Sequence, residues 1–159
     1  MDLWTLNKWK SYYKNGEHRT GIRVRYEKDV DGEVKRAINE CVSWMRENYE
    51  FPKRINLYVK SARRIKAMNG ENVCGTFFRP ADRNEEPYIR MSTGDYPELL
   101  EKRGKDNALA SILITMFHEL SHYYQWLNDL NLTLIGEERQ ATIYEKKRIS
   151  DYAETRDHP

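Results

Sequence analysis

The sequence predicts an α+β fold, because helical and strand-like patterns occupy separate stretches of the chain. Apolar residues recur at helical spacing over residues 31–49 and again over a long segment that begins near residue 106. Between these segments lie three short strand-like runs, at residues 55–59, 73–78 and 88–91. A last helix is expected over residues 136–153. The order of a helix, strands and then two helices is typical of an α+β domain with a small antiparallel or mixed sheet.

Length and composition predict one globular domain covering residues 1–159. The chain is 39% hydrophobic and 12% aromatic, which is more aromatic content than disordered chains carry. Its formal net charge is only +2, so composition requires neither a nucleic-acid nor a membrane partner. The two cysteines, Cys41 and Cys74, and the lack of a signal-peptide-like or membrane-spanning run favour a cytoplasmic protein with reduced thiols.

Residues 1–29 form a basic N-terminal arm. Its basic residues are Lys8, Lys10, Lys14, Arg19, Arg23, Arg25 and Lys28, and its aromatic residues include Trp4, Trp9, Tyr12 and Tyr13. Basic and aromatic side chains together are typical of segments that bind nucleic acid or an acidic partner. Because acidic residues dilute the charge here, we favour a solvated arm or a short helix whose aromatic rings pack on the core.

The first helix is expected over residues 31–49. Asp31 is a suitable N-cap residue, and Phe51-Pro52 stops the helical pattern. The apolar stripe of this helix consists of Val34, Ile38, Cys41, Met45 and Tyr49.

The strand region is divided by turn signals. The run Ile55–Val59 alternates apolar and polar residues, and Asn69-Gly70 predicts a turn before the second run, Val73–Phe78. Arg79-Pro80 ends that run, and a polar loop leads to the third run, Tyr88–Met91.

The motif that carries chemistry is His118-Glu119-Leu120-Ser121-His122, which lies within the strongest helical pattern. Histidines four residues apart lie on one face of a helix, one turn apart, so both rings can reach one tetrahedral metal ion. The apolar side chains of this helix share roughly the opposite face; they are Leu113, Met116, Leu120, Tyr124 and Leu127. The helix is therefore expected to have one face for packing and one for His118 and His122.

Glu119 is the expected catalytic residue of this motif. In HExxH sites the glutamate acts as general base on a zinc-bound water, whose pKa the metal lowers to roughly 7. Two histidines with a carboxylate favour zinc over harder cations, so we expect one Zn²⁺ per chain.

A catalytic zinc usually has a third protein ligand, and the residues leave several candidates open. The last helix carries the best source, its carboxylates Glu137, Glu138, Glu145 and Glu154. His18 lies in the basic arm and is also a candidate, whereas His158, the penultimate residue, is a poor one.

The segments FHELSHYYQWL and EERQATIYEKKRI together resemble the minimal gluzincin arrangement, in which a second helix bears a glutamate ligand in an E-x-x-A pattern. The resemblance implies that Glu138 is the third ligand and that Ala141 lets the two helices approach. Residues 31–153 also resemble the core of SprT-like and ImmA/IrrE-like peptidases, which implies a zincin-like arrangement. In those folds an edge strand pairs with an extended substrate, a role that the resemblance assigns to Tyr88, Ile89, Arg90 and Met91.

Two features depart from these families. SprT-like enzymes use a third histidine soon after HExxH, and here none follows before His158. Many gluzincins carry an aspartate four residues after the glutamate ligand, where it supports a zinc-bound histidine, and this chain has Thr142 there. Loss of such a partner weakens metal affinity or activity unless another group, such as a backbone carbonyl, replaces it.

A second electrophile often helps zinc to stabilise the oxyanion of peptide hydrolysis. The candidates are Tyr123, Tyr144, Arg148 and Tyr152, of which Tyr152 shares the face of Glu138 most closely by helical spacing. The alternative for the tyrosines is packing in the core with their hydroxyl groups hydrogen-bonded.

These observations predict a zinc metallopeptidase that hydrolyses an amide bond of a protein or peptide substrate. The alternative is a catalytically silent zinc-binding module that interacts with nucleic acid or a regulatory protein. An intact Glu119 favours the enzyme, because a purely structural site does not need it. A zinc hydrolase acting on a non-peptide amide is a third hypothesis.

Overall fold

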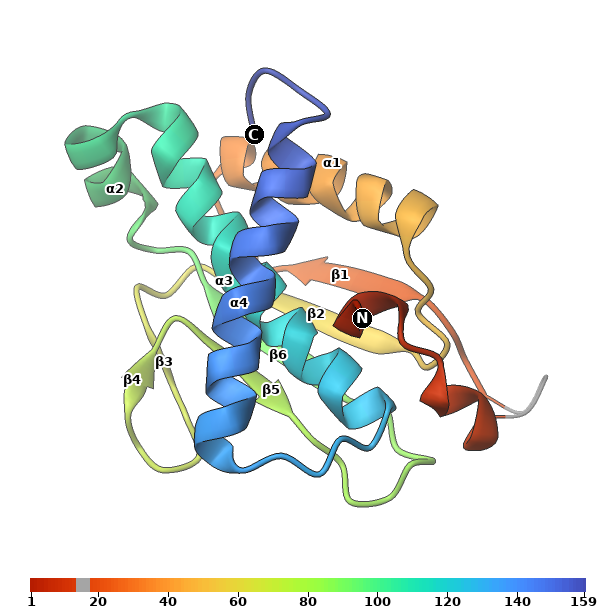
Figure 1. The fold of residues 1–159 in the computed structure, drawn as a ribbon. Coiled ribbons are helices and arrows are strands. Elements are labelled where there is room, and N and C mark those ends of the chain that lie inside the picture. Colours follow the sequence, from red (N-terminus) through yellow and green to blue (C-terminus); the bar gives the residue numbers. More distant parts are fainter. Residues whose placement is uncertain (14–17) are drawn as a thin grey trace.

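The computed structural model describes residues 1–13 and 18–159 and has the α+β architecture expected from the sequence (Figure 1). Helices pack on a mixed four-stranded sheet, and a two-stranded antiparallel hairpin forms a second, smaller sheet. Lys14, counted above with the basic arm, lies outside the described residues. Over the described ranges, no helix is both long enough and apolar enough to cross a membrane.

The main sheet contains, in spatial order, β1 (Ile22–Tyr26), β2 (Ile55–Lys60), β6 (Tyr88–Ser92) and β5 (Gly75–Phe78). The first three strands run parallel, and β5 lies antiparallel to β6 at one edge. Alternate side chains of the two central strands are buried, as the period of a pleated strand requires. They join the core formed with the helices, and they are Ile55, Leu57, Val59, Ile89 and Met91.

The position of β6 corrects the expectation that it is the edge strand. Ile89 lies opposite Leu57 of β2 on one side and opposite Phe77 of β5 on the other. The backbone of Tyr88–Met91 is therefore paired on both sides, and no edge is left there for a substrate strand. The free edge beside α3 belongs to β5 instead.

The helices agree closely with the sequence patterns. α1 (Gly32–Asn48) connects the parallel strands β1 and β2, and Asp31 caps it by accepting a hydrogen bond of 2.8 Å from the backbone N–H of Glu33. α3 (Lys105–Leu127) and α4 (Leu134–Ala153) begin within two residues of the predicted positions and pack against each other. The short helix α2 (Tyr96–Arg103) was not predicted.

A small hairpin stands beside the main sheet. Its strands are β3 (Ile65–Lys66) and β4 (Asn72–Val73), and the predicted turn at Asn69-Gly70 joins them. Gly70 has a φ of 85°, a left-handed conformation that glycine adopts without steric cost. The predicted run Val73–Phe78 is therefore split, because its first residue belongs to the hairpin and its last four form β5.

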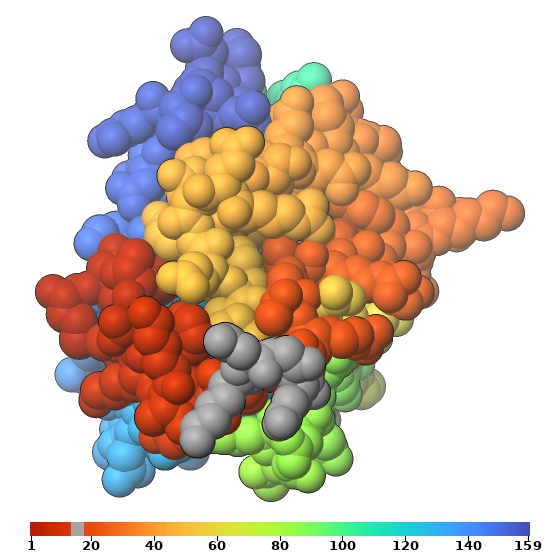
Figure 2. Space-filling model, turned by 90° about the vertical axis from the view of Figure 1, so that its right-hand side faces the viewer, coloured from red at the N-terminus to blue at the C-terminus, as the bar shows by residue number. Residues whose placement is uncertain are grey.

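The N-terminal residues pack on the rest of the domain, where they form the red area at the lower left of Figure 2, and Leu3 and Trp4 join the core. The 3₁₀ helix η1 (Leu3–Thr5) lies against α3, and η2 (Lys8–Ser11) follows it. The indole N–H of Trp4 donates a 3.1 Å hydrogen bond to Oγ of Ser121, and the ring is 2% exposed. The expected short helix with a packed aromatic ring is thus confirmed at Trp4. A solvated arm over residues 1–29 is wrong, because residues 22–26 form β1, a strand that sequence analysis missed.

We predict that Trp4→Ala lowers the free energy of unfolding by about 3–5 kcal/mol, because it removes a large buried ring and leaves a cavity beside α3. Denaturant titration followed by circular dichroism measures this change. The control is Lys8→Ala on the exposed side of η2, which should change stability by less than about 0.5 kcal/mol. Equal effects of the two substitutions would contradict the assignment of the N-terminal segment to the core.

Candidate metal centre

Helix α3 places His118 and His122 on the side that faces α4. Their ring centroids lie 5.0 Å apart, one helical turn from each other. The opposite face of the same helix, which includes Leu120 and Tyr124, is fully buried in the core. The expected division of α3 into a packing face and a histidine face is confirmed.

Glu138, from the second turn of α4, completes a cluster with the two histidines. One carboxylate oxygen lies 3.0 Å from Nε2 of His118, and the other lies 2.9 Å from Nε2 of His122. One atom of each side chain can be chosen so that all three lie within 4.8 Å of one another. Within the described part of the chain this is the only group of histidine, cysteine and acidic residues with such spacing, and it could hold a metal ion.

The donor set is suited to zinc. Two imidazole nitrogens and one carboxylate oxygen are the ligand types of zinc sites that keep a fourth position open. Tetrahedral bonds of about 2.0–2.1 Å place donor atoms about 3.3 Å apart, so His–Glu separations of 2.9 and 3.0 Å need only a small outward shift. Burial also lowers the pKa of His122, which favours the neutral imidazole that a metal requires.

Gln125 orients the ring of His122. Its side-chain carbonyl lies 2.8 Å from Nδ1 of His122, and its amide nitrogen donates to the backbone carbonyl of Glu137 at 2.9 Å and to Oε1 of Gln140 at 3.0 Å. Because these partners leave Gln125 only its oxygen for the ring, Nδ1 of His122 carries the proton. Nε2 then keeps its lone pair toward Glu138 and the cluster.

Glu145 holds His118 in the same way. Its carboxylate lies 3.3 Å from Nδ1 of His118, leaving Nε2 to face Glu138. Glu145 follows Glu138 by seven residues, which is about two helical turns, so both project from one face of α4. In many gluzincins an aspartate at the position of Thr142 supports a zinc-bound histidine. Here Glu145, three residues after Thr142, contacts Nδ1 of His118 and can take that role.

Glu119 is buried, with 7% exposure, and lines the same cavity as His122 and Glu138. Burial raises the pKa of its carboxyl to about 7, and the negative charges of Glu138 and Glu145 act in the same direction, although His118 opposes them. A carboxyl group with such a pKa can accept and return a proton near neutral pH.

Gly75, at the start of β5, allows this close approach. A Cβ atom added there would lie 2.9 Å from Cγ of Glu119 and 3.0 Å from Cγ2 of Thr115. A glycine inside a strand run is a sequence signal for such an approach, but the sequence does not say which helix approaches.

The other candidate ligands are engaged elsewhere. The carboxylate of Glu137 pairs with Arg79 at 2.7 Å, and His18 contacts the backbone carbonyl of Pro52 at 2.7 Å. His158 pairs with Asp106 at 2.8 Å, and Glu154 forms the C-cap of α4. Of the alternatives left open by the sequence, only Glu145 reaches the cluster, where it contacts the outer nitrogen of His118.

Tyr152 is not at the metal centre, which corrects the expectation that it stabilises an oxyanion. It follows Glu138 by fourteen residues on α4, about 21 Å along the helix axis at 1.5 Å per residue. Its ring packs on Trp44 with 5.1 Å between centroids, and burial raises its pKa to about 12. A shared helical face was therefore a poor guide, because distance along the axis also decides proximity.

The remaining oxyanion candidates also serve the core. Tyr123 donates a 2.6 Å hydrogen bond to the backbone carbonyl of Lys53, and Tyr144 donates one of 3.0 Å to that of Met1. Arg148 is buried and pairs with Asp2. Residues near the cluster that sequence analysis did not assign are Gln125, Gly75 and Arg79.

Comparison with models of protein families, with curated proteins and with solved structures found no match to this chain.

We predict that the protein binds about one zinc ion per chain and that His122→Ala and Glu138→Ala each abolish this binding. Elemental analysis after removal of free metal measures the content. Glu137→Ala is the matched control, because it removes the neighbouring carboxylate, which pairs with Arg79, and should leave zinc bound. Zinc retained in Glu138→Ala but lost in Glu137→Ala would show that Glu137, and not Glu138, is the third ligand.

The residues behind the histidines should tune affinity without abolishing binding. We expect Gln125→Ala and Glu145→Gln each to weaken zinc affinity by about 10- to 100-fold, since each removes the partner of an imidazole Nδ1. Competition with a chelating dye measures the dissociation constant, with Glu154→Gln as the control at the far end of α4. Unchanged affinity in both variants would show that the histidines need no such support.

Proposed function

We propose that the protein is a zinc-dependent metallopeptidase in which His118, His122 and Glu138 bind the metal and Glu119 is the general base. The observation that carries this proposal is the position of Glu119, a buried carboxyl group that lines the same cavity as His122 and Glu138. Burial there raises the pKa of Glu119 to about 7. A structural zinc site needs only its ligands, whereas a buried carboxyl beside them costs stability whenever it ionises. Such a group is typical of an active site.

Zinc bound here would supply Lewis-acid polarisation of a carbonyl group and would acidify a water molecule. Glu119 takes the proton of the attacking water as the new carbon–oxygen bond forms. It then delivers that proton to the amide nitrogen as the carbon–nitrogen bond breaks. Gln125 and Glu145 keep the two imidazole rings fixed throughout, so that little reorganisation is needed during the reaction.

The substrate is proposed to lie extended along β5. This strand has a free edge, its first residue Gly75 touches Glu119, and β5 contacts α3. Backbone N–H and C=O groups on that edge can pair with a peptide in any sequence, which supports a protein or peptide as the substrate class. Residues of β5, of the HExxH helix α3 and of the glutamate helix α4 line one cavity of about 430 Å³. This arrangement supports a zincin-like assignment.

The silent zinc-binding module has less support. A site that only binds zinc does not explain why a carboxyl group, that of Glu119, is buried against Gly75 next to the ligands. A non-peptide amide is also disfavoured, because the strand edge offers pairing that only a polypeptide uses fully. A cytoplasmic location remains part of the proposal, supported by the free thiols of Cys41 and Cys74.

We predict that Glu119→Gln lowers the rate of peptide cleavage by about 10²- to 10⁴-fold while zinc content stays unchanged, because the amide cannot accept the proton. Cleavage of an unfolded protein and of a degenerate peptide library, followed by mass spectrometry, measures the rate. The control is Glu101→Gln, an exposed residue of α2, which should cleave like the wild type. Removal of zinc with a chelator should stop cleavage, and readdition should restore it.

Cleavage that is equal in Glu119→Gln and the wild type would remove the enzymatic proposal. Retained zinc without cleavage in the wild type would instead favour the binding module.

A further inference from the structure

Exposed apolar side chains gather around the groove above the metal centre. Within the described part of the chain, the large hydrophobic residues with the most exposed side chains include Met68 at the tip of the β3–β4 hairpin, at 99%, and Leu134 and Ile135 at the start of α4, at 81% and 72%. Ile143, two turns further along α4, is 57% exposed. Clustered exposure of this kind marks a binding surface, whereas single exposed apolar residues are common.

These residues line cavities that join one another at the cluster. A cavity of about 430 Å³ is bordered by Met68, Phe77 and Leu134 and reaches His122, Glu119 and Glu138. A neighbouring cavity of about 580 Å³ along α4 shares Leu134 and Glu138 with it. On the other side, a third cavity of about 490 Å³ shares Glu119, Glu138 and Gly75. The groove therefore runs from the hairpin, across the cluster, onto the outer surface of α4.

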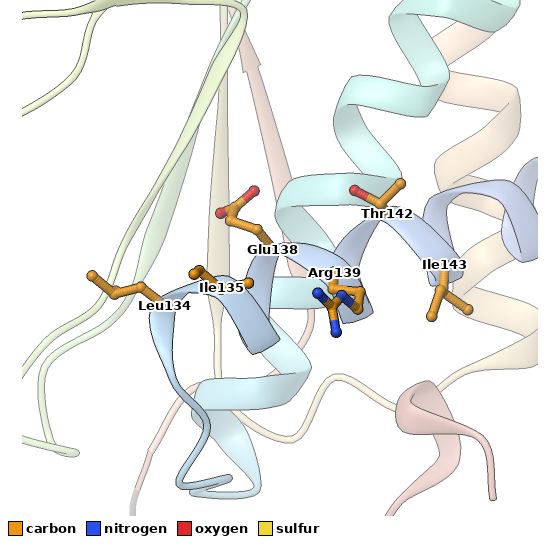
Figure 3. Close-up of a pocket in the computed structure, with 6 residues that line it drawn as sticks. All are labelled: Leu134, Ile135, Glu138, Arg139, Thr142 and Ile143. Carbon is orange, nitrogen blue, oxygen red and sulfur yellow. The ribbon is translucent and has the colours of Figure 1, made fainter.

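The α4 end of the groove is apolar with a basic margin. Its lining residues are Leu134, Ile135, Glu138, Arg139, Thr142 and Ile143 (Figure 3). In Figure 3, Glu138 and Thr142 point to one side of the helix, and Arg139 and Ile143 point to the other. Leu134 lies on the helical row of Glu138 and Thr142, so a chain that binds beside Glu138 meets Leu134 directly. Ile135 and Ile143 flank Arg139 on the adjacent row and border the same cavity.

We propose that this surface selects substrates, and that the protein cleaves polypeptide segments that carry bulky aliphatic or aromatic side chains within a few residues of the scissile bond. Leu134, Ile135 and Ile143 are the specificity-determining residues on α4, and Met68 lines the adjoining cavity together with Leu134. This inference rests on the proposed peptidase function.

The substrate is the occupant that the structure favours over a second copy of the chain. Leu134 and Glu138 line both the apolar surface and the cavity at the cluster, and β5 lines that cavity too, so a chain that lies along β5 is next to this surface. A stable dimer involves about 20–30 residues on each side, many more than this narrow surface offers. A copy seated here would also cover Glu138, whose side chain is 65% exposed.

The test uses a degenerate peptide library with the zinc-loaded wild type and with Leu134→Ser/Ile135→Ser. We expect the wild type to cleave peptides with bulky apolar residues near the scissile bond, and the double variant to lose about 10- to 100-fold in kcat/KM on those peptides only. Peptides with small residues at those positions should be cleaved equally by both proteins. Leu100→Ser on α2, a residue that is 40% exposed away from the groove, is the matched control.

A binding measurement separates failure of this inference from failure of the proposed function. Zinc-loaded Glu119→Gln, with and without Leu134→Ser/Ile135→Ser, is titrated with fluorescent peptides that carry leucine or serine at the same positions. Preferred binding of the leucine peptide, lost with the double substitution, supports the apolar surface even if no cleavage occurs. Equal binding of both peptides, or cleavage without apolar preference, would overturn it. So would a dimer in light scattering that dissociates in the double variant, since the surface would then be an interface between copies.

Discussion

The rest of the structure depends on the packing of α3 between the sheet and α4. One face of this helix must be apolar, and the polar side chains of the other face must be hydrogen-bonded or paired. From Met116 to Leu127 nearly every residue is buried, so the polar side chains of this part of the helix cannot be hydrated by solvent. Apolar side chains meet the sheet, and each polar side chain on the other side must find a partner on a neighbouring element. Ser121 accepts a hydrogen bond from Trp4, and Gln125 donates one to a backbone carbonyl in the first turn of α4. The two histidines contact the carboxylate of Glu138. The candidate site is thus part of the contact that holds the helices together.

Charge in this contact is unbalanced without a cation. Glu119, Glu138 and Glu145 converge on two histidines, and the pKa of Glu119 rises because burial and the neighbouring carboxylates disfavour a further negative charge. A bound divalent cation would offset this repulsion and stabilise the contact between α3 and α4. The same residues would therefore serve both the stability of this contact and the proposed function.

Arg148, first considered as an electrophile, stabilises the C-terminal half of α4 instead. Arg148 is buried, lies over the rings of Trp4 and Tyr49, and pairs with Asp2. Through Asp2 and Trp4, this side chain links the N-terminal segment to α4. Such a buried cation needs its partners, because an unpaired charge there costs several kcal/mol.

The sequence by itself determined the local features: the bounds of α1, α3 and α4, the Asp31 cap, the turn at Asn69-Gly70, and the pairing of His118 and His122 on one helical face. These depend on periodicity and residue type over a few turns, which the sequence displays directly. Only the tertiary structure decided which strand lies at the edge and how far along α4 each side chain sits. β6 is interior because β5 folds back beside it, and Tyr152 is distant because helical spacing fixes direction but not distance. Glu145, Gln125 and Gly75 acquire their roles from contacts between segments far apart in the chain, and the pattern of a single segment carries no record of such contacts.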